Sequence, residues 1–215
     1  MLRKRIISAI ILTLLLVGMF FLNKIMFYLA LAAVAGLGVA EIWSANIGKH
    51  KTKIGFFLFL IFPSIYVVLS LVWIVGKLRW EGNVFWLILA LVGTSAYDTF
   101  AYFLGKSIGG KHKIAPKISP NKTLEGTICG FLGPILVAAI TGIYFMPMSL
   151  LQIAMLGLII GFLAFFGDLS ESWYKRRLGI KDMGNIIPGH GGLLDRIDSH
   201  LLVFVGVFCF RALAS

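Results

Sequence analysis

Long apolar blocks separated by short polar segments make up most of the chain. These blocks cover residues 6–22, 25–43, 54–76, 84–104, 126–146, 150–167 and 201–214. A helix rises about 1.5 Å per residue, so about 20 residues cross the roughly 30 Å of hydrocarbon in a bilayer. The first six blocks are long enough to do so, whereas the seventh is short, contains Arg211 and also fits a re-entrant or interfacial helix. The pattern predicts an all-α polytopic membrane protein with about seven transmembrane helices.

The composition agrees with this prediction, because 59% of the residues are hydrophobic and only 13% are charged. Soluble domains carry about 25% charged residues. We predict a single membrane domain over residues 1–215. Its parts are the N-terminal helices, a central region and a last helix, at 1–83, 84–199 and 200–215. The central region contains two long polar segments, 105–123 and 169–198, which we expect to be cytoplasmic loops.

Basic residues predict the orientation of the helices. The chain has 20 Lys and Arg against 9 Asp and Glu, a net charge of +11. With a cytoplasmic N-terminus, sixteen of the basic residues lie on the cytoplasmic side and only Lys24, Lys77, Arg79 and Arg211 lie opposite. This excess predicts a multi-pass protein of the inner (plasma) membrane. A basic face attracts anionic lipid headgroups and phosphorylated solutes, and we expect no nucleic acid as a partner.

Four acidic residues lie within or at the ends of apolar blocks: Glu41, Asp98, Glu125 and Asp168. A charged side chain at the centre of a bilayer helix costs at least about 2.5 to 3.5 kcal/mol, so such a carboxylate is a candidate functional group. For Asp98, a structural contact with Tyr102 or a loop lysine explains the position as well as a catalytic role does. We interpret Glu41 as structural.

Polar residues are densest after the sixth block. If its helix continues, Asp168, Ser172 and Lys175 share one face of that helix. Further along the chain, a glycine turn at 189–192 precedes two carboxylates, at 195 and 198. Glycine lets backbone N–H groups approach an anion, and Lys and Arg neutralise phosphate oxygens. Mg²⁺ favours one or two carboxylates together with substrate phosphates. Each residue alone fits a solvated loop, but their density indicates a protein that handles nucleotides.

Three motifs in this segment resemble the signature of the phosphatidate cytidylyltransferases. They are Ser172-x-x-Lys175-Arg176, Lys181-Asp182 and Pro188-Gly-His-Gly-Gly-x-x-Asp195-Arg196-x-Asp198. Upstream, residues 98–102 and 119–126 also resemble that family, in the expected order. The resemblance covers about residues 98–199, whereas the N-terminal part is similar to the family only as a set of apolar spans.

The resemblance implies an all-helical, homodimeric membrane enzyme that makes CDP-diacylglycerol and pyrophosphate from CTP and phosphatidate. Its implied cofactor is Mg²⁺, with a monovalent cation as a second candidate. Asp168 and Asp195 are then the expected Mg²⁺ ligands, and Lys175, Asp198 and Asp98 are further catalytic candidates. The expected substrate-binding residues are Ser119, Asn121, Lys122, Glu125, Ser172, Arg176, Lys181, Asp182, His190, Gly191, Gly192 and Arg196. The site would open to the cytoplasm for CTP and to the inner leaflet for the lipid.

Two other functions are compatible with parts of the sequence. A transporter or ion carrier could line its pathway with Asp98 and Glu125. The sequence has no paired broken helices or inverted halves, which would favour a carrier. The other alternative is a related lipid kinase or a cytidylyltransferase that acts on another lipid. Substrate competition would distinguish it from a phosphatidate cytidylyltransferase.

Overall fold

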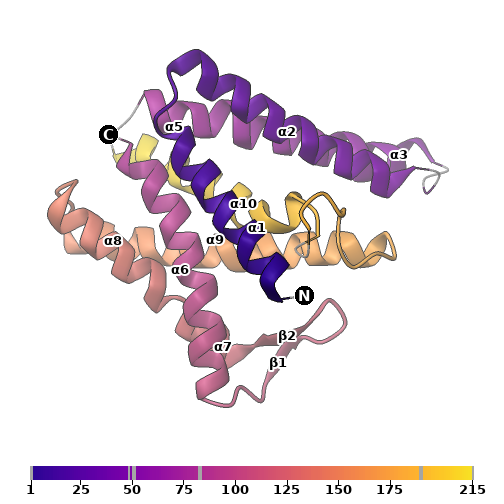
Figure 1. Ribbon diagram of the computed structural model, residues 1–215. Coiled ribbons are helices and arrows are strands. Elements are labelled where there is room, and N and C mark those ends of the chain that lie inside the picture. The colour runs from indigo at the N-terminus through magenta and orange to yellow at the C-terminus, as the bar shows by residue number, and fades with distance from the viewer. Residues whose placement is uncertain (1, 48, 50–51, 82–83, 189–190, 215) are drawn as a thin grey trace. The chain divides into compact units, whose positions relative to one another are not determined.

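The protein is almost entirely helical in a computed structural model that describes residues 2–47, 49, 52–81, 84–188 and 191–214 (Figure 1). Its long helices are α1 (Leu2–Met19), α2 (Lys24–Asn46), α6 (Phe85–Ser107), α8 (Leu132–Tyr144), α9 (Leu150–Arg177) and α10 (Leu194–Ala214). The short α7 (Leu124–Gly130) leads into α8. Between α2 and α6, one helical run comprises α3 (Lys53–Phe56), α4 (Phe62–Val68) and α5 (Gly76–Trp80), with π-helical turns at Phe57–Ile61 and Leu69–Val75. The all-α prediction is confirmed.

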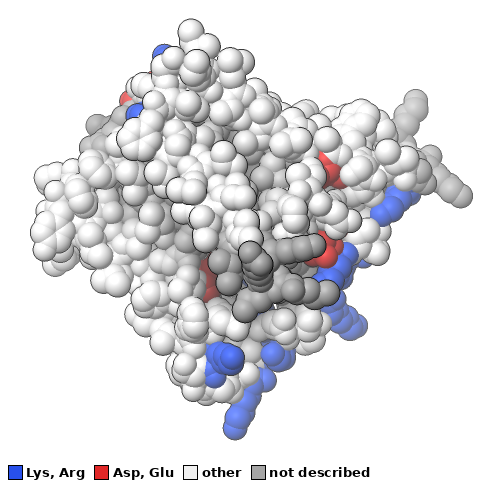
Figure 2. Space-filling model, viewed as in Figure 1, with Lys and Arg blue, Asp and Glu red and all other residues white. Residues whose placement is uncertain are grey.

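Within the described residues, five helices are long and apolar enough to cross a membrane. They are Lys24–Asn46, Ile54–Trp80, Phe85–Ser107, Leu124–Tyr144 and Leu150–Arg177. The chain is therefore a multi-pass membrane protein, and Figure 2 shows wide surfaces without charged side chains, as lipid-facing helices require. The first and last predicted blocks are helical as α1 and α10, but the number of seven spans stays a prediction.

The first polar segment, 105–123, contains a small β-hairpin that the sequence did not predict. Strand β1 (Lys113–Ala115) pairs antiparallel with β2 (Ser119–Thr123), and Lys113 lies opposite Thr123. The side chain of Thr123 then caps α7 by accepting a hydrogen bond from the N–H of Gly126 at 3.2 Å. The hairpin therefore enters α7 directly.

The second polar segment, 169–198, is a loop only over residues 178–193. Helix α9 continues to Arg177, because residues 168–177 contain no Gly or Pro and end in three basic residues that favour a helix C-terminus. Helix α10 begins at Leu194. The polar residues that follow the sixth apolar block are thus displayed on two helices, and Asp168 lies inside α9.

The chain forms two compact units. The first, here called the N-terminal unit, comprises Met1–Gly76 and Tyr174–Ile197. Its core includes Phe27, Ile42 and Val67, each no more than 3% exposed. The second, the central unit, comprises Lys77–Trp173 and Asp198–Ser215. Its fully buried residues include Leu89, Leu156, Ile160, Val203 and Val207. Helices α9 and α10 each contribute to both units.

Candidate active site

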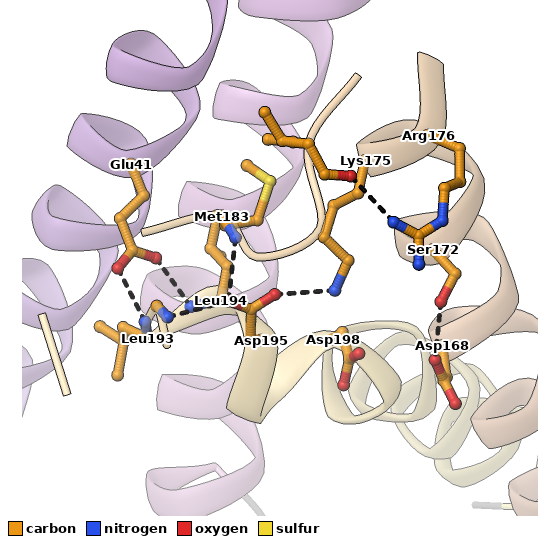
Figure 3. A network of polar contacts seen from close by, with 12 residues as sticks. Glu41, Asp168, Ser172, Lys175, Arg176, Met183, Leu193, Leu194, Asp195 and Asp198 are labelled. Atoms are coloured by element: carbon orange, nitrogen blue, oxygen red, sulfur yellow. Dashed lines mark hydrogen bonds and ion pairs between the residues drawn. The ribbon is translucent and has the colours of Figure 1, made fainter. Parts of the chain in front are cut away.

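The predicted site residues form two groups of polar contacts, one in each unit. The first, the Asp195 cluster, lies in the N-terminal unit and comprises Glu41, Lys175, Met183, Gly192, Leu193, Leu194 and Asp195. The second, the Asp168 cluster, lies in the central unit and comprises Asp98, Lys122, Asp168, Ser172 and Asp198. Figure 3 shows the contacts of Asp195 and Glu41 and the contact between Asp168 and Ser172.

Asp195, in the first turn of α10, uses both carboxylate oxygens. Its Oδ1 lies 2.7 Å from Nζ of Lys175 on α9. Its Oδ2 accepts hydrogen bonds from the backbone N–H groups of Met183 at 2.9 Å and Gly192 at 2.8 Å. The side chains of Asp195 and Lys175 are only 6% and 11% exposed. In such a site each charge depends on the other for compensation, and the N-terminus of α10 favours the negative one.

Two of the three glycines of the motif, Gly191 and Gly192, lie in the described part of the turn before α10. Gly191 has a φ of +89°, which L side chains rarely adopt. A Cβ at Gly192 would lie 2.8 Å from each carboxylate oxygen of Glu41. The sequence suggested that such glycines expose N–H groups to a substrate anion. In this structure the N–H of Gly192 binds the carboxylate of Asp195.

Glu41 of α2 also belongs to this cluster, which the sequence did not indicate. It is 3% exposed, and its two oxygens accept hydrogen bonds from the N–H groups of Leu193 at 2.7 Å and Leu194 at 2.9 Å. The available signal was a carboxylate inside an apolar block. Its partners could not be read from the sequence.

Other side chains of the N-terminal helices hold the end of α9 and the loop that follows. Asn46 donates a hydrogen bond to the hydroxyl of Tyr174 at 2.7 Å. Nζ of Lys49 lies 2.9 Å from the carbonyl oxygen of Leu178. Asn46 and Lys49 therefore support the end of α9 and the start of the loop that follows it.

In the central unit, Asp168 lies between a lysine and a serine. Its Oδ2 is 2.8 Å from Nζ of Lys122, and its Oδ1 accepts a hydrogen bond from Ser172 at 3.2 Å. This contact confirms that residues four apart on α9 share a face. Nζ of Lys122 also lies 3.3 Å from the carbonyl oxygen of Phe165 and 4.8 Å from the centre of its ring. The Asp168 side chain is 33% exposed, so a ligand can reach it.

Two more carboxylates complete the Asp168 cluster. Asp98 on α6 is repelled by the charges of Asp168 and of Asp198 on α10, and the charge of Lys122 opposes this repulsion. Gly167 brings α9 close to α10 here, since a Cβ on it would lie 2.9 Å from Cα of Ser199. Repulsion between neighbouring carboxylates favours a bound cation. Within the described ranges, however, no three His, Cys, Asp or Glu side chains form a metal-binding group.

Glu125 lies at the base of the hairpin. Its Oε1 is 2.6 Å from Nδ1 of His112 and accepts hydrogen bonds from the N–H groups of Lys111 and His112 at 3.2 and 3.4 Å. It thus fixes the segment that enters β1. Strand β2 carries Ser119, which is half-buried, and Asn121, which is exposed.

The remaining predicted residues lie at the surface. Arg176, Lys181, Asp182 and Arg196 are all exposed, and Arg176 donates a hydrogen bond to the carbonyl oxygen of Ile180 at 3.1 Å. Exposed guanidinium and ammonium groups can neutralise phosphate oxygens. His190 lies outside the described residues.

Comparison with known proteins identifies the family of this chain. The sequence pattern of the cytidylyltransferase family matches residues 43–214. The chain is 43% identical over 123 residues to a phosphatidate cytidylyltransferase of Bacillus subtilis, covering 55% of this chain and 44% of that protein. It is 40% identical over 136 residues to the chloroplastic phosphatidate cytidylyltransferase 4 of Arabidopsis thaliana, covering 63% and 34%. It is 42% identical over 130 residues to the uncharacterized protein YnbB of Escherichia coli, covering 60% and 43%. The matched part thus spans less than half the length of these relatives.

Proposed function

The chain belongs to the cytidylyltransferase family, and on this basis we propose that it makes CDP-diacylglycerol and pyrophosphate from CTP and phosphatidate. The observation that carries the proposal is the contact between Lys175 of α9 and Asp195 of α10 at 2.7 Å, which joins two separate motifs of the family signature. The relatives named phosphatidate cytidylyltransferase support the choice of lipid. We assign both clusters to this reaction because each contains residues of the motifs that resemble the family signature.

In the proposed reaction, a phosphate oxygen of phosphatidate forms a bond to the α-phosphorus of CTP. The bond from that phosphorus to the oxygen that bridges to the β-phosphorus breaks, and pyrophosphate leaves with this oxygen and its electron pair. The attacking group is already an anion, so no strong base is required. The main barrier is the repulsion between two polyanions, and fixed positive charge lowers it.

Four cations of the chain are suited to that task. Lys175 and Lys122 are held by Asp195 and Asp168, and we assign them to the phosphates at the reacting centre. Arg176 and Lys181 are exposed, and we assign them to the triphosphate or the lipid phosphate as these arrive. We also propose that the nucleotide site is lined by Ser119 and Asn121 of β2, by the loop residues Asp182, Gly191 and Gly192, and by Arg196 of α10.

The carboxylates fit a bound Mg²⁺, because hard oxygen donors are the ligands that this ion prefers. Asp168 is partly exposed, and we propose Asp168 and Asp195 as Mg²⁺ ligands, with Asp98 and Asp198, whose charges interact with each other, as weaker candidates. Bound Mg²⁺ would neutralise phosphate oxygens and favour departure of pyrophosphate. A monovalent cation is a second candidate for the same acidic cluster.

We also propose that the protein lies in the inner (plasma) membrane as a homodimer, with the site facing the cytoplasm. The orientation is supported by the distribution of basic residues, of which sixteen of twenty lie on the predicted side of the two polar segments. The homodimer rests on the family resemblance alone. On that side the site can receive CTP from the cytoplasm and phosphatidate from the adjacent leaflet.

The test is pyrophosphate release by the detergent-purified protein. CTP, phosphatidate and Mg²⁺ are supplied together and then omitted one at a time, beside Asp168→Ala and Asp195→Ala variants shown to be folded. Release that requires all three components and is lost in both variants supports the proposal. No release by folded wild-type protein in phosphatidate-containing bilayers would contradict it.

A further inference from the structure

Glu41 occupies an unusual position for a carboxylate. It lies in an apolar helix, α2, is 3% exposed, and belongs to the same unit as Lys175 and Asp195. Both of its oxygens are directed at the two residues that precede Asp195, with distances of 2.7 Å to the N–H of Leu193 and 2.9 Å to the N–H of Leu194 (Figure 3). Its position, residue 41, precedes the segment 43–214 that matches the family pattern.

The chemistry of a helix start explains the contact. The first N–H groups of a helix have no partner within it, and a negative charge near them is favourable. Here α2 supplies that charge instead of a residue of the turn itself. The fit is close, since a Cβ at Gly184 or Gly192 would lie 2.8 Å from Oε1 of Glu41. The turn has room for this carboxylate because both residues are glycine.

The same turn also orients Asp195. Its Oδ2 accepts a hydrogen bond from Gly192, the residue just before the two that Glu41 holds. A shift of Leu193 and Leu194 would therefore move both the backbone of Asp195 and one of the donors that fix its carboxylate. Lys175, bound to Oδ1, would lose its partner at the same time.

We propose that Glu41 is a positioning residue for the transfer reaction. By holding the N–H groups of Leu193 and Leu194, it keeps Asp195 and Lys175 in the arrangement that the reacting phosphates and the metal require. This role rests on the proposed function. It gives helix α2, which the family pattern barely includes, a part in catalysis beyond membrane anchoring.

Glu41→Gln separates this role from simple filling of space. Glutamine has nearly the same shape, but it offers one acceptor oxygen and turns an NH₂ group toward a backbone donor. Glu41→Asp keeps the charge but is one methylene too short to reach both N–H groups. Glu81→Gln is the matched control, because Glu81 is an exposed glutamate whose carboxylate pairs with Lys77, one helical turn before it.

Hydrogen–deuterium exchange of peptides spanning 183–195 provides the first measurement and does not depend on activity. We expect the amides of Leu193 and Leu194 to exchange at least about tenfold faster in Glu41→Gln than in wild type, because their acceptor is disturbed. The Glu81→Gln control should leave them unchanged. Unchanged exchange in Glu41→Gln would overturn the proposal.

Steady-state kinetics provide the second measurement. Loss of a residue that orients a metal ligand costs about 10- to 100-fold in affinity or activity. We therefore expect Glu41→Gln to lower kcat by at least about tenfold and to raise the Mg²⁺ concentration for half-maximal rate, with KM for phosphatidate unchanged. The kcat of Glu41→Asp should lie between those of Glu41→Gln and wild type.

Three results would overturn the positioning role. Unaltered kcat and Mg²⁺ dependence, despite faster exchange, would make Glu41 a helix cap without effect on the reaction. A uniform fall in all kinetic parameters, or failure of Glu41→Gln to fold, would make it a residue of general stability. If wild-type protein transfers no cytidylyl group, the proposed function fails, whereas the exchange result still decides whether Glu41 holds the turn.

Discussion

Nζ of Lys175, near the end of α9, lies 2.7 Å from Oδ1 of Asp195, in the first turn of α10. This one contact connects two motifs that are separated by the loop 178–193. Because both side chains are nearly buried, the pair acts as a structural link between the two helices. We infer that the ammonium group of Lys175 also interacts with a phosphate oxygen when CTP binds, which weakens its pairing with Asp195.

Breaking this pair from one side should destabilise the protein. Lys175→Met leaves the carboxylate of Asp195 buried with two backbone donors and no cation, and loss of one partner of a buried pair costs about 3 to 5 kcal/mol. Lys175→Met combined with Asp195→Asn removes both charges and should recover part of that loss while remaining inactive. Unfolding in detergent, followed by intrinsic fluorescence, measures both.

The control for this experiment is Lys117→Met, at an exposed position of the hairpin turn. The change in side-chain chemistry is the same, but no buried partner is left behind. If Lys175→Met were no less stable than Lys117→Met, the pair would not link the two helices as described.

Substitution of Lys122 should lower the kcat of the proposed reaction. Lys122 lies 2.8 Å from Asp168 and is 16% exposed, so its charge is held close to the acidic cluster. Lys122→Gln should lower kcat by on the order of 100-fold, as expected when one preorganised group that stabilises developing charge is removed. Lys113→Gln, on the neighbouring strand and exposed, is the control and should change kcat little. Equal effects of the two substitutions on kcat would indicate that Lys122 acts only through a general attraction of the basic surface for anionic substrates.

A methyl group at Gly192 should disturb the turn before α10. A Cβ there would lie 2.8 Å from both oxygens of Glu41, and overpacking of this kind costs about 1 to 3 kcal/mol. Gly36→Ala, on the same helix as Glu41 and with no atom within 4 Å of its Cβ, should instead be neutral or gain about 0.5 to 1 kcal/mol. Thermal unfolding compares the two variants. A Gly192→Ala protein as stable as Gly36→Ala would show that the turn adapts.

The orientation in the membrane can be tested with single cysteines. In a background without Cys129 and Cys209, Lys113→Cys on the hairpin and Glu81→Cys should lie on opposite sides. A membrane-impermeant thiol reagent should label Lys113→Cys only in inside-out vesicles and Glu81→Cys only in right-side-out vesicles. Labelling of both in the same vesicles would contradict the predicted topology.

The helices were predictable because a bilayer forces each apolar segment to satisfy its own backbone hydrogen bonds. The blocks 25–43 and 54–76 fall within the observed Lys24–Asn46 and Ile54–Trp80 spans. The hairpin was not predictable, since β2 has the sequence Ser-Pro-Asn-Lys-Thr, of which Pro and Asn are poor strand formers. Glu125 of α7 accepts hydrogen bonds from the segment just before β1, and local propensity does not indicate this contact.

The site shows the same limit of local patterns. The shared face of Asp168 and Ser172 follows from helical period alone, and the structure confirms it. Glu41 is 152 residues from Leu193, and no spacing rule connects positions so far apart. The sequence could mark Glu41 as costly in an apolar helix, but only tertiary structure identifies the N–H groups that it holds.

Isotope tracing with labelled CTP distinguishes the proposed reaction from lipid phosphorylation. The purified protein is incubated with phosphatidate, Mg²⁺ and CTP that carries ³²P at either the α or the γ position, and the lipid fraction is then extracted. Cytidylyl transfer predicts that α label enters the lipid and γ label is released as pyrophosphate. Entry of γ label into the lipid would identify a kinase, and absence of both labels from the lipid would contradict transfer to phosphatidate.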